Sequence, residues 1–494
     1  MNKLFTRSAL VAVLAAGLGF GLAGCKDAIN IQPQQSIDIS TAFNTPQKVQ
    51  AAVVGCYARL DDPRLYGTDL ILVPELLGSN AYINWEGTFQ NYRQLRLRTQ
   101  DAQNSNALGI WRLAYTTINQ ANLVLANLGI ITDVAAKAQY EGEVRFIRGA
   151  LYFELVRLYA TQYKPGGNNT QDGVPINLAA NTTLNQADTQ SKLPRASVEQ
   201  VYAQVISDLT AAMQKLPTQN VTRASKYSAE ALLARVYLQQ GNYTAARAAA
   251  NNVITKSGAA LVGSVAAVFA NRNSAESLFE IQQNDQNNAG TSNDGLATYF
   301  AGYSPNGDQS VLYGRGDVSI SGVFADLYDP ADLRGPDTLS AISTRKLIYL
   351  SDGNSRVGRL RTLKWRTYGQ NIPVIRLAEM YLIRAECDVR AGASADNDVN
   401  LIRQRSGAPV LANATLADVL LERQLELAFE GFRIYDLKRV NEILVPFRAA
   451  VPATPIAPAI PAVQQVLANA SQLTLPIPQQ ERNNNPNLTQ NPGY

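Results

Sequence analysis

Three glutamates at regular spacing are the residues of this chain best suited to acid-base chemistry. Glu422, Glu426 and Glu430 follow each other at i+4 within the stretch LLERQLELAFEGFRIYDLKR, residues 420–439. Glycosidases use such carboxylates in catalytic pairs, whereas packed helices use them in ion-pair networks. Like charges at i+4 repel each other in an isolated helix, so this stripe needs cations from elsewhere in the chain.

The arginines that interleave with these acids favour the ion-pair interpretation. Arg433 and the arginines within residues 374–386 and 403–405 are the expected partners. Nothing apolar isolates one of the glutamates in a way that would raise its pKa for proton donation. We therefore predict a structural network without a catalytic residue, and a carboxylate-only glycosidase is the less favoured alternative.

The absence of histidine narrows the possible chemistry further. It excludes Ser-His-Asp and Cys-His catalysis, HExxH zinc sites and His-ligated haem. The Asp-containing segments NDG and GDQ suit a Ca²⁺ ion in principle, but such segments more often cap turns. We predict no cofactor and no metal site.

Amphipathic helices must position the three glutamates. Within residues 420–439 the apolar residues fall at the i, i+4, i+7, i+8 and i+11 spacing of one buried helix face: Leu421, Leu425, Ala428, Phe429 and Phe432. A helix hairpin over residues 225–254 has two apolar stripes separated by Gly241-Asn242, as in a tetratricopeptide repeat. Similar pairs over 111–160, 373–405 and 414–446 predict a stack of helical hairpins without a strict repeat length.

Several of these stretches resemble the SusD/RagB family of outer-membrane nutrient-binding lipoproteins. The resemblance is carried by ERQLELAFEGFRIYDLKR, by PVIRLAEMYLIRAEC at 373–387, by WRLAYTTINQANLVLANL with EVRFIRGALYFELVRLYA, and by the end LTLPIPQQERNNNPNLTQNPGY. It covers nearly the whole chain after the leader. It implies a mostly α, tetratricopeptide-like scaffold whose long irregular loops and few short strands form the ligand-binding face.

The N-terminus has the form of a bacterial lipoprotein signal. Lys3 and Arg7 precede an apolar run that is too short to span a bilayer, and Leu22-Ala23-Gly24 leads to Cys25. We predict that Cys25 is lipidated and anchors the protein in the outer membrane. Lys26-Asp27 has the basic-then-acidic start of the export tag of surface lipoproteins, and we therefore expect the protein to face the cell exterior. The sequence departs from that tag at Ala28, where a second acid is expected.

The expected layout is a signal peptide at 1–24, a tether at 25–40 and one SusD-like domain at 41–494. Helical repeats are expected at about 41–60, 107–160, 195–256 and 373–446, and loop-rich segments at about 63–106 and 277–366. Strands are predicted at LFEIQQ, at 346–350 and at 363–365. Cys56 and Cys387 lie in apolar helical patterns, which predicts buried thiols without a disulfide.

Loop aromatics and amides are the candidate ligand-binding residues. Aromatic faces stack on the CH groups of sugars, and amides bind their hydroxyls. The loops 78–93 and 284–316 contain such residues without helical spacing: Tyr82, Asn84, Trp85, Tyr92, Tyr299, Tyr303 and Tyr313. For Trp85 the alternative is a core position, and Trp111 and Trp365 lie in patterned segments that predict core positions.

The resemblance implies a protein without enzymatic activity that captures a glycan or another nutrient oligomer. It would deliver this ligand to a SusC-like TonB-dependent transporter. A formal net charge of +4, of which Lys3 and Arg7 supply two, gives no electrostatic case for nucleic acid as a partner. The alternative is a tetratricopeptide-like scaffold that binds only proteins, through its helical grooves.

Overall fold

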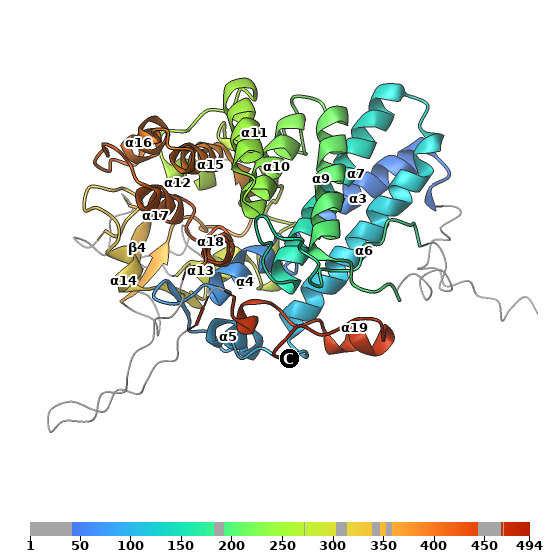
Figure 1. Ribbon diagram of the computed structural model, residues 1–494, viewed down its shortest axis with the longest axis horizontal. Coiled ribbons are helices and arrows are strands. Elements are labelled where there is room, and N and C mark those ends of the chain that lie inside the picture. Colours follow the sequence, from blue (N-terminus) through green and yellow to red (C-terminus); the bar gives the residue numbers. More distant parts are fainter. Residues whose placement is uncertain are drawn as a thin grey trace, which may run out of the picture.

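Helices dominate the computed structural model, which describes residues 42–181, 192–270, 272–302, 314–337, 346–351, 358–442, 466–467 and 469–494 (Figure 1). The scaffold helices are α3 (Pro46–Leu60), α6 (Ser105–Asn127), α7 (Val134–Tyr159), α9 (Val198–Lys215), α10 (Lys226–Gln240), α11 (Tyr243–Lys256), α15 (Leu377–Arg390), α16 (Asp396–Arg405), α17 (Leu416–Glu426) and α18 (Arg433–Val440). Shorter helices are α4 (Asp69–Leu77), α5 (Gln90–Leu97), α12 (Val265–Ala270), α13 (Leu296–Phe300), α14 (Gly322–Ala325) and α19 (Gln479–Asn484). The predicted mostly α, tetratricopeptide-like class is confirmed.

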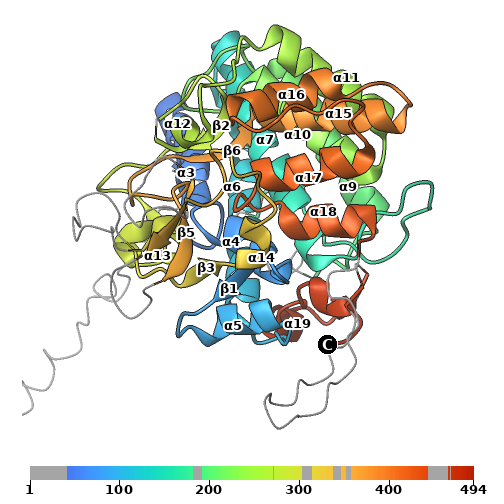
Figure 2. The same ribbon diagram turned by 90° about the vertical axis from the view of Figure 1, so that its left-hand side faces the viewer.

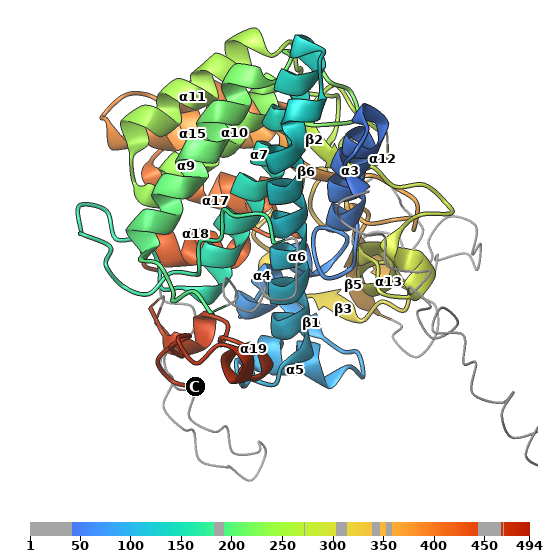
Figure 3. The same cartoon turned by 90° about the vertical axis from the view of Figure 1, so that its right-hand side faces the viewer.

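Local capping chemistry explains where the scaffold helices begin and end. The Thr45 side chain accepts from the Lys48 N–H and Pro46 occupies the first turn of α3. Gly241 ends α10 with a left-handed φ of +71°, and the side chain of Asn242 caps α11. This is the predicted hairpin, and Figure 3 shows α7, α9, α10 and α11 side by side.

The central helix α7 is buried from Gly142 to Tyr159 except at Arg145, as its apolar residues on every face predict. One continuous core surrounds it and reaches from Phe43 to Leu488. Trp111 and Trp365 lie in this core, and Cys56 and Cys387 are buried free thiols, so these predictions are confirmed. Within the described residues, no helix combines the length and apolarity that a membrane crossing requires.

Two small antiparallel sheets complete the fold beside the helices (Figure 2). The first sheet has the order β1 (Ile83–Trp85), β3 (Val318–Ile320), β5 (Arg359–Thr362) and β4 (Ile348–Ser351). The second sheet pairs β2 (Ser277–Ile281) with β6 (Ile372–Arg376). The strands predicted at LFEIQQ and near 346–350 are present.

Two sequence assignments in this part of the chain are wrong. Residues 363–365 form no strand, because β5 ends at Thr362. Pro373 does not begin a helix, because it lies within β6. The segment from Pro63 to Ala107 is more regular than its sequence predicts. It contains α4, which is buried on all sides and therefore has no amphipathic period, and α5.

The helix predicted over residues 420–439 is in fact two helices. Helix α17 ends at Glu426 and α18 begins at Arg433. Between them Phe429 and Gly431 have left-handed φ values of +68° and +86°. A residue with positive φ leaves the helical path, so the chain turns and Glu430 is not part of the helical stripe.

Asp61, at the end of α3, is predicted to make stability depend on pH. Burial raises its pKa from 3.8 to about 6, which outweighs a hydrogen bond from Gln283, and Asp62 adds to the increase. Because folding favours the protonated acid, stability is lost as pH rises from 3.8 to about 6. Asp61→Asn should therefore stabilise the protein by about 1–3 kcal/mol at pH 7.5 and much less at pH 4.

Thermal unfolding at both pH values tests this prediction. Asp285→Asn is the control, because the Asp285 side chain is 89% exposed. An equal effect of Asp61→Asn at the two pH values would contradict the expected titration.

Candidate functional site

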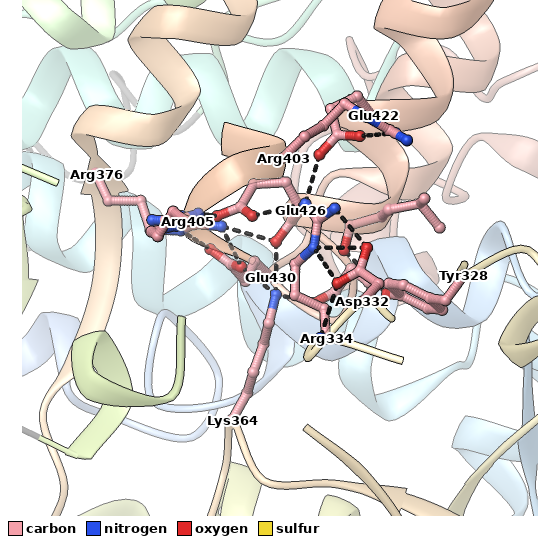
Figure 4. Close-up of polar contacts among 12 residues, drawn as sticks. Tyr328, Asp332, Arg334, Lys364, Arg376, Arg403, Arg405, Glu422, Glu426 and Glu430 are labelled. Carbon is pink, nitrogen blue, oxygen red and sulfur yellow. Dashed lines mark hydrogen bonds and ion pairs between the residues drawn. The ribbon is translucent and has the colours of Figure 1, made fainter. Parts of the chain in front are cut away.

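A buried cluster of charges surrounds the three glutamates, and Figure 4 shows its contacts. Its carboxylates come from three segments of the chain: Glu276, Asp332, Glu422, Glu426 and Glu430. Its cations come from the Asp332 segment and from three further places: Arg334, Lys364, Arg376, Arg403 and Arg405. We call this set the charge network.

Each glutamate of the predicted stripe has at least two cationic partners. Arg334 Nη1 lies 2.6 Å from Glu422 Oε1 and 2.9 Å from Glu426 Oε2. Arg376 bonds Glu426 and also lies 2.8 Å from Glu430 Oε2. Charges removed from water in this way are tolerated only when they are paired and hydrogen-bonded.

The predicted partners of the stripe are partly right. Arg376, Arg403 and Arg405 are confirmed. Arg384 is wrong because it pairs with Asp398 at 2.7 Å, and Arg433 is wrong because its guanidinium faces Glu442 at 3.7 Å. For Arg433 the reason is the turn after Glu426, which moves this residue away from the stripe. Sequence reasoning also missed Arg334 and Lys364, which come from the loop-rich region and carry no periodic signal.

The electrostatics of the charge network argue against acid catalysis by Glu426. Burial alone would raise the pKa of this carboxyl, but Arg405, Arg376 and Arg334 hold the pKa well below its usual range. A general acid needs a proton near neutral pH, so its pKa must be raised instead. The geometry supports the predicted structural role of the stripe.

The turn between α17 and α18 is itself held by buried polar groups. Lys364 Nζ donates to the carbonyls of Glu426 and Ala428 at 2.7 and 2.9 Å. On the other side, Glu75 of α4 accepts the backbone N–H groups of Gly431, Phe432 and Arg433 at 2.7 to 3.4 Å. An acid at these N–H groups also complements the positive end of α18.

The aromatic residues predicted to bind ligand form a second cluster. Trp85 on β1, Tyr92 on α5 and Tyr299 on α13 have ring centroids 4.7 to 5.4 Å apart. The structure thus brings together residues from the two predicted ligand-binding loops, 78–93 and 284–316. These three rings are only 7%, 2% and 0% exposed, however, and we call them the aromatic cluster.

Hydrogen bonds fix the aromatic cluster from within. The Tyr92 hydroxyl donates to Asp69 Oδ1 at 2.7 Å, and the Tyr299 hydroxyl donates to Asp294 Oδ1 at 2.8 Å. Asp69 is fully buried and its pKa is raised by that burial, although Arg64 and Tyr92 oppose the increase. Trp85 Nε1 is buried without a hydrogen-bond partner among the described residues.

The remaining predicted ligand residues lie elsewhere. Tyr82 is a core residue: its ring stacks on Phe429 at 5.4 Å, and its hydroxyl accepts the Phe429 N–H. The side chain of Asn84 is half-buried and accepts from Arg96 at 2.7 Å. Tyr303, Tyr313 and the lipidation residue Cys25 lie outside the described residues.

Burial corrects the expectation that these tyrosines stack directly on a ligand. Stacking needs an open ring face, and protein covers the rings of Tyr82, Tyr92 and Tyr299. Loop position alone did not reveal this, because irregular segments show no periodic burial signal. A ligand-binding role for the surrounding surface, and for Tyr303 and Tyr313, stays a prediction.

Phe89 is the exposed aromatic residue that sequence reasoning missed. Its ring is 40% exposed and lies 6.5 Å from Tyr92, at the border of the aromatic cluster. The guanidinium of Arg315 lies 5.0 Å from the Phe89 ring and 5.3 Å from the Tyr299 ring, within cation-π distance. The signal was available in the sequence, since Phe89 lies within the selected loop 78–93.

Comparison with known proteins places this chain in a family. A model described as "SusD family" matches residues 361–494, and one described as "Starch-binding associating with outer membrane" matches residues 31–238. The SusD-like protein P2 of Formosa agariphila is 30% identical to this chain over an alignment of 523 positions. The alignment covers 96% of this chain and 97% of that protein. The chain belongs to the SusD family. The resemblance seen in the sequence is therefore confirmed.

Two further comparisons describe this SusD-family chain. It is 30% identical over 155 residues to the starch-binding protein SusD of Bacteroides thetaiotaomicron, which is 27% of this chain and 26% of that protein. A crystal structure of a SusD superfamily protein from the same species has a TM-score of 0.75 at 24% identity, covering 91% of this chain and all of that one. The second similarity establishes the fold.

Proposed function

We propose that this SusD-family protein captures a glycan, or another nutrient oligomer, at the cell surface without catalysing a reaction. It then delivers the ligand to a SusC-like TonB-dependent transporter. The proposal rests on the similarity to SusD-like proteins over nearly the whole chain. It is further supported by the match to the outer-membrane starch-binding model and by the low pKa of Glu426, which argues against acid catalysis by that carboxyl.

The surface around Phe89 is our proposed place of capture. The open ring of Phe89 can pack against sugar CH groups. The guanidinium of Arg315 nearby is held in place by an ion pair with Asp317 at 2.8 Å. Gln90 is exposed and Asn84 is half-buried, so their amides can bind hydroxyl groups. The aromatic cluster would support this surface from below.

A binding measurement on Phe89→Ala tests the proposal. We expect the wild type to bind at least one member of a panel of neutral oligosaccharides in calorimetry. Phe89→Ala should weaken that binding about tenfold, which corresponds to loss of an aromatic contact worth about 1–3 kcal/mol, and should leave the melting temperature unchanged. Leu401→Ala on α16 is the control, because Leu401 is a comparably exposed apolar residue at 43%.

Two outcomes would contradict this proposal in different ways. If no oligosaccharide of the panel binds, glycan capture is wrong. If one binds and Phe89→Ala binds it equally well, capture takes place elsewhere on the molecule.

The proposed membrane attachment depends on Cys25 alone. Cys25→Ala should leave the membrane fraction and remain folded, because the variant cannot receive the lipid. Fractionation followed by thermal unfolding of the released protein measures both results. Retention of the variant in the membrane fraction would show a second anchor.

A further inference from the structure

A polar cavity lies in a different part of the molecule from Phe89. It has a volume of about 210 Å³ and opens between three connecting segments. These are residues 218–225 between α9 and α10, residues 257–259 after α11, and residues 273–280 leading into β2. Figure 2 shows α12 and β2 on the side of the molecule away from α5, which follows Phe89.

Two packed aromatic residues bound this cavity on its inner side. Tyr227 and Phe279 line it and are 8% and 5% exposed. The Phe279 ring packs edge-to-face against Phe146 at 4.9 Å and lies 6.5 Å from Tyr57. These rings bound the cavity and offer van der Waals contact, but at this exposure they present no open face for stacking.

The walls of the cavity carry amides and hydroxyls. Gln219 donates from Nε2 to the Ser257 carbonyl at 2.9 Å, and Asn220 donates from Nδ2 to Glu143 and Ala224. Within the part of the chain that the structure describes, the side-chain oxygens of both residues accept no hydrogen bond. Ser274 and Ser277 line the opposite wall, with their hydroxyls 3.2 Å apart. Each of these groups retains hydrogen-bonding capacity.

The charged groups at the cavity are already engaged by protein. Arg223 Nη1 lies 3.3 Å from Glu143 Oε2, and the guanidinium lies 5.6 Å from the Tyr57 ring. Glu280 accepts from Ser277 and, at 2.8 Å, from the Asn273 N–H. A ligand therefore meets mainly neutral amides and hydroxyls, which favours an uncharged, hydroxyl-rich molecule.

We propose that this cavity binds one neutral sugar residue. Its volume is below the roughly 300–1,000 Å³ of sites for drug-sized ligands, so it limits the occupant to about one monosaccharide unit. The site shares its ligand class with the proposed capture surface, and to that extent it rests on the proposed function. It uses none of the residues at Phe89, so each site can be tested separately.

The test uses the protein without its predicted signal peptide, residues 1–24. D-glucose, D-galactose and D-mannose are each added alone. We expect a saturation-transfer NMR signal from at least one of these hexoses. Ser274→Phe places a ring in the cavity and should reduce that signal at least fivefold. Ser394→Phe is the matched control, because Ser394 is exposed on the connection before α16 and does not line the cavity.

Further variants separate the possible outcomes. Gln219→Trp fills the cavity from the other wall and must reproduce the loss, which guards against a folding defect of Ser274→Phe. Phe89→Ala should keep the hexose signal even where it loses oligosaccharide binding. Absence of a signal from all three hexoses, or a signal that survives both filling variants, would overturn this site without affecting the proposed capture surface.

Discussion

Replacing Glu426 with alanine should lower the free energy of unfolding by about 3–5 kcal/mol, the range for breaking a buried ion pair. The carboxylate is fully buried and is bonded by Arg334, Arg376 and Arg405. Its removal leaves these guanidinium groups in the core with one partner fewer. Urea unfolding at pH 7 measures the loss.

The pH dependence of this loss provides an independent check. Because the folded pKa of Glu426 is well below 4.5, its contribution is complete above that pH and is lost only as pH falls toward the folded pKa. The difference between wild type and Glu426→Ala should thus persist at pH 5.5. Glu442→Ala is the control, because the Glu442 side chain is 53% exposed and lies 3.7 Å from Arg433, and it should change stability by less than about 0.5 kcal/mol.

Two results would refute the structural role of the charge network. One is a Glu426→Ala variant that loses less than 1 kcal/mol of stability, on the order of an exposed pair. The other is a stable variant that has lost a measurable hydrolytic activity of the wild type, which would revive the glycosidase interpretation.

Trp85→Ala should cost about 3–5 kcal/mol of stability, the range for deleting a large buried aromatic side chain. The indole is 7% exposed and packs on Tyr92 and Tyr299. A Cβ on Gly87 would lie 2.6 Å from the indole ring, so the backbone also closes around it. The cavity left by alanine cannot be refilled without moving these neighbours. Chemical unfolding measures the change.

Two comparison variants show whether Trp85 acts through packing. Trp85→Phe should cost less than Trp85→Ala, because it keeps an aromatic ring and removes the buried Nε1–H that has no partner among the described residues. Phe89→Ala should leave stability unchanged. If Trp85→Ala keeps its stability and loses only glycan affinity, Trp85 contacts the ligand and the core assignment is wrong.

The helices that were predictable are those with one apolar face or clear capping residues. The hairpin around Gly241 carried both signals, and α7 was recognisable by the helical spacing of its apolar residues. Helix α4 was not, since complete burial removes the amphipathic period. The break after Glu426 was missed because Phe429 continues the helical spacing, and only the backbone shows its positive φ.

The candidate site was predictable at the level of segments and not of individual contacts. The absence of helical spacing selected the loops that carry Trp85 and Tyr299, and these residues do meet. Their depth depends on α4 and β3, whose positions follow from long-range packing rather than local sequence. For the same reason Arg334 and Lys364 could not be assigned to the glutamate stripe.

Arg334 and Lys364 fix two points of the loop-rich region to the motif around α17 and α18. A buried, paired charge cannot be replaced singly without a large loss, whereas an exposed loop residue usually can. The anchoring residues therefore tolerate few substitutions, whereas exposed residues such as Phe89 tolerate more. A frame of this kind separates robustness from variability: after gene duplication, a copy could accept new surface side chains while it keeps the same stable scaffold.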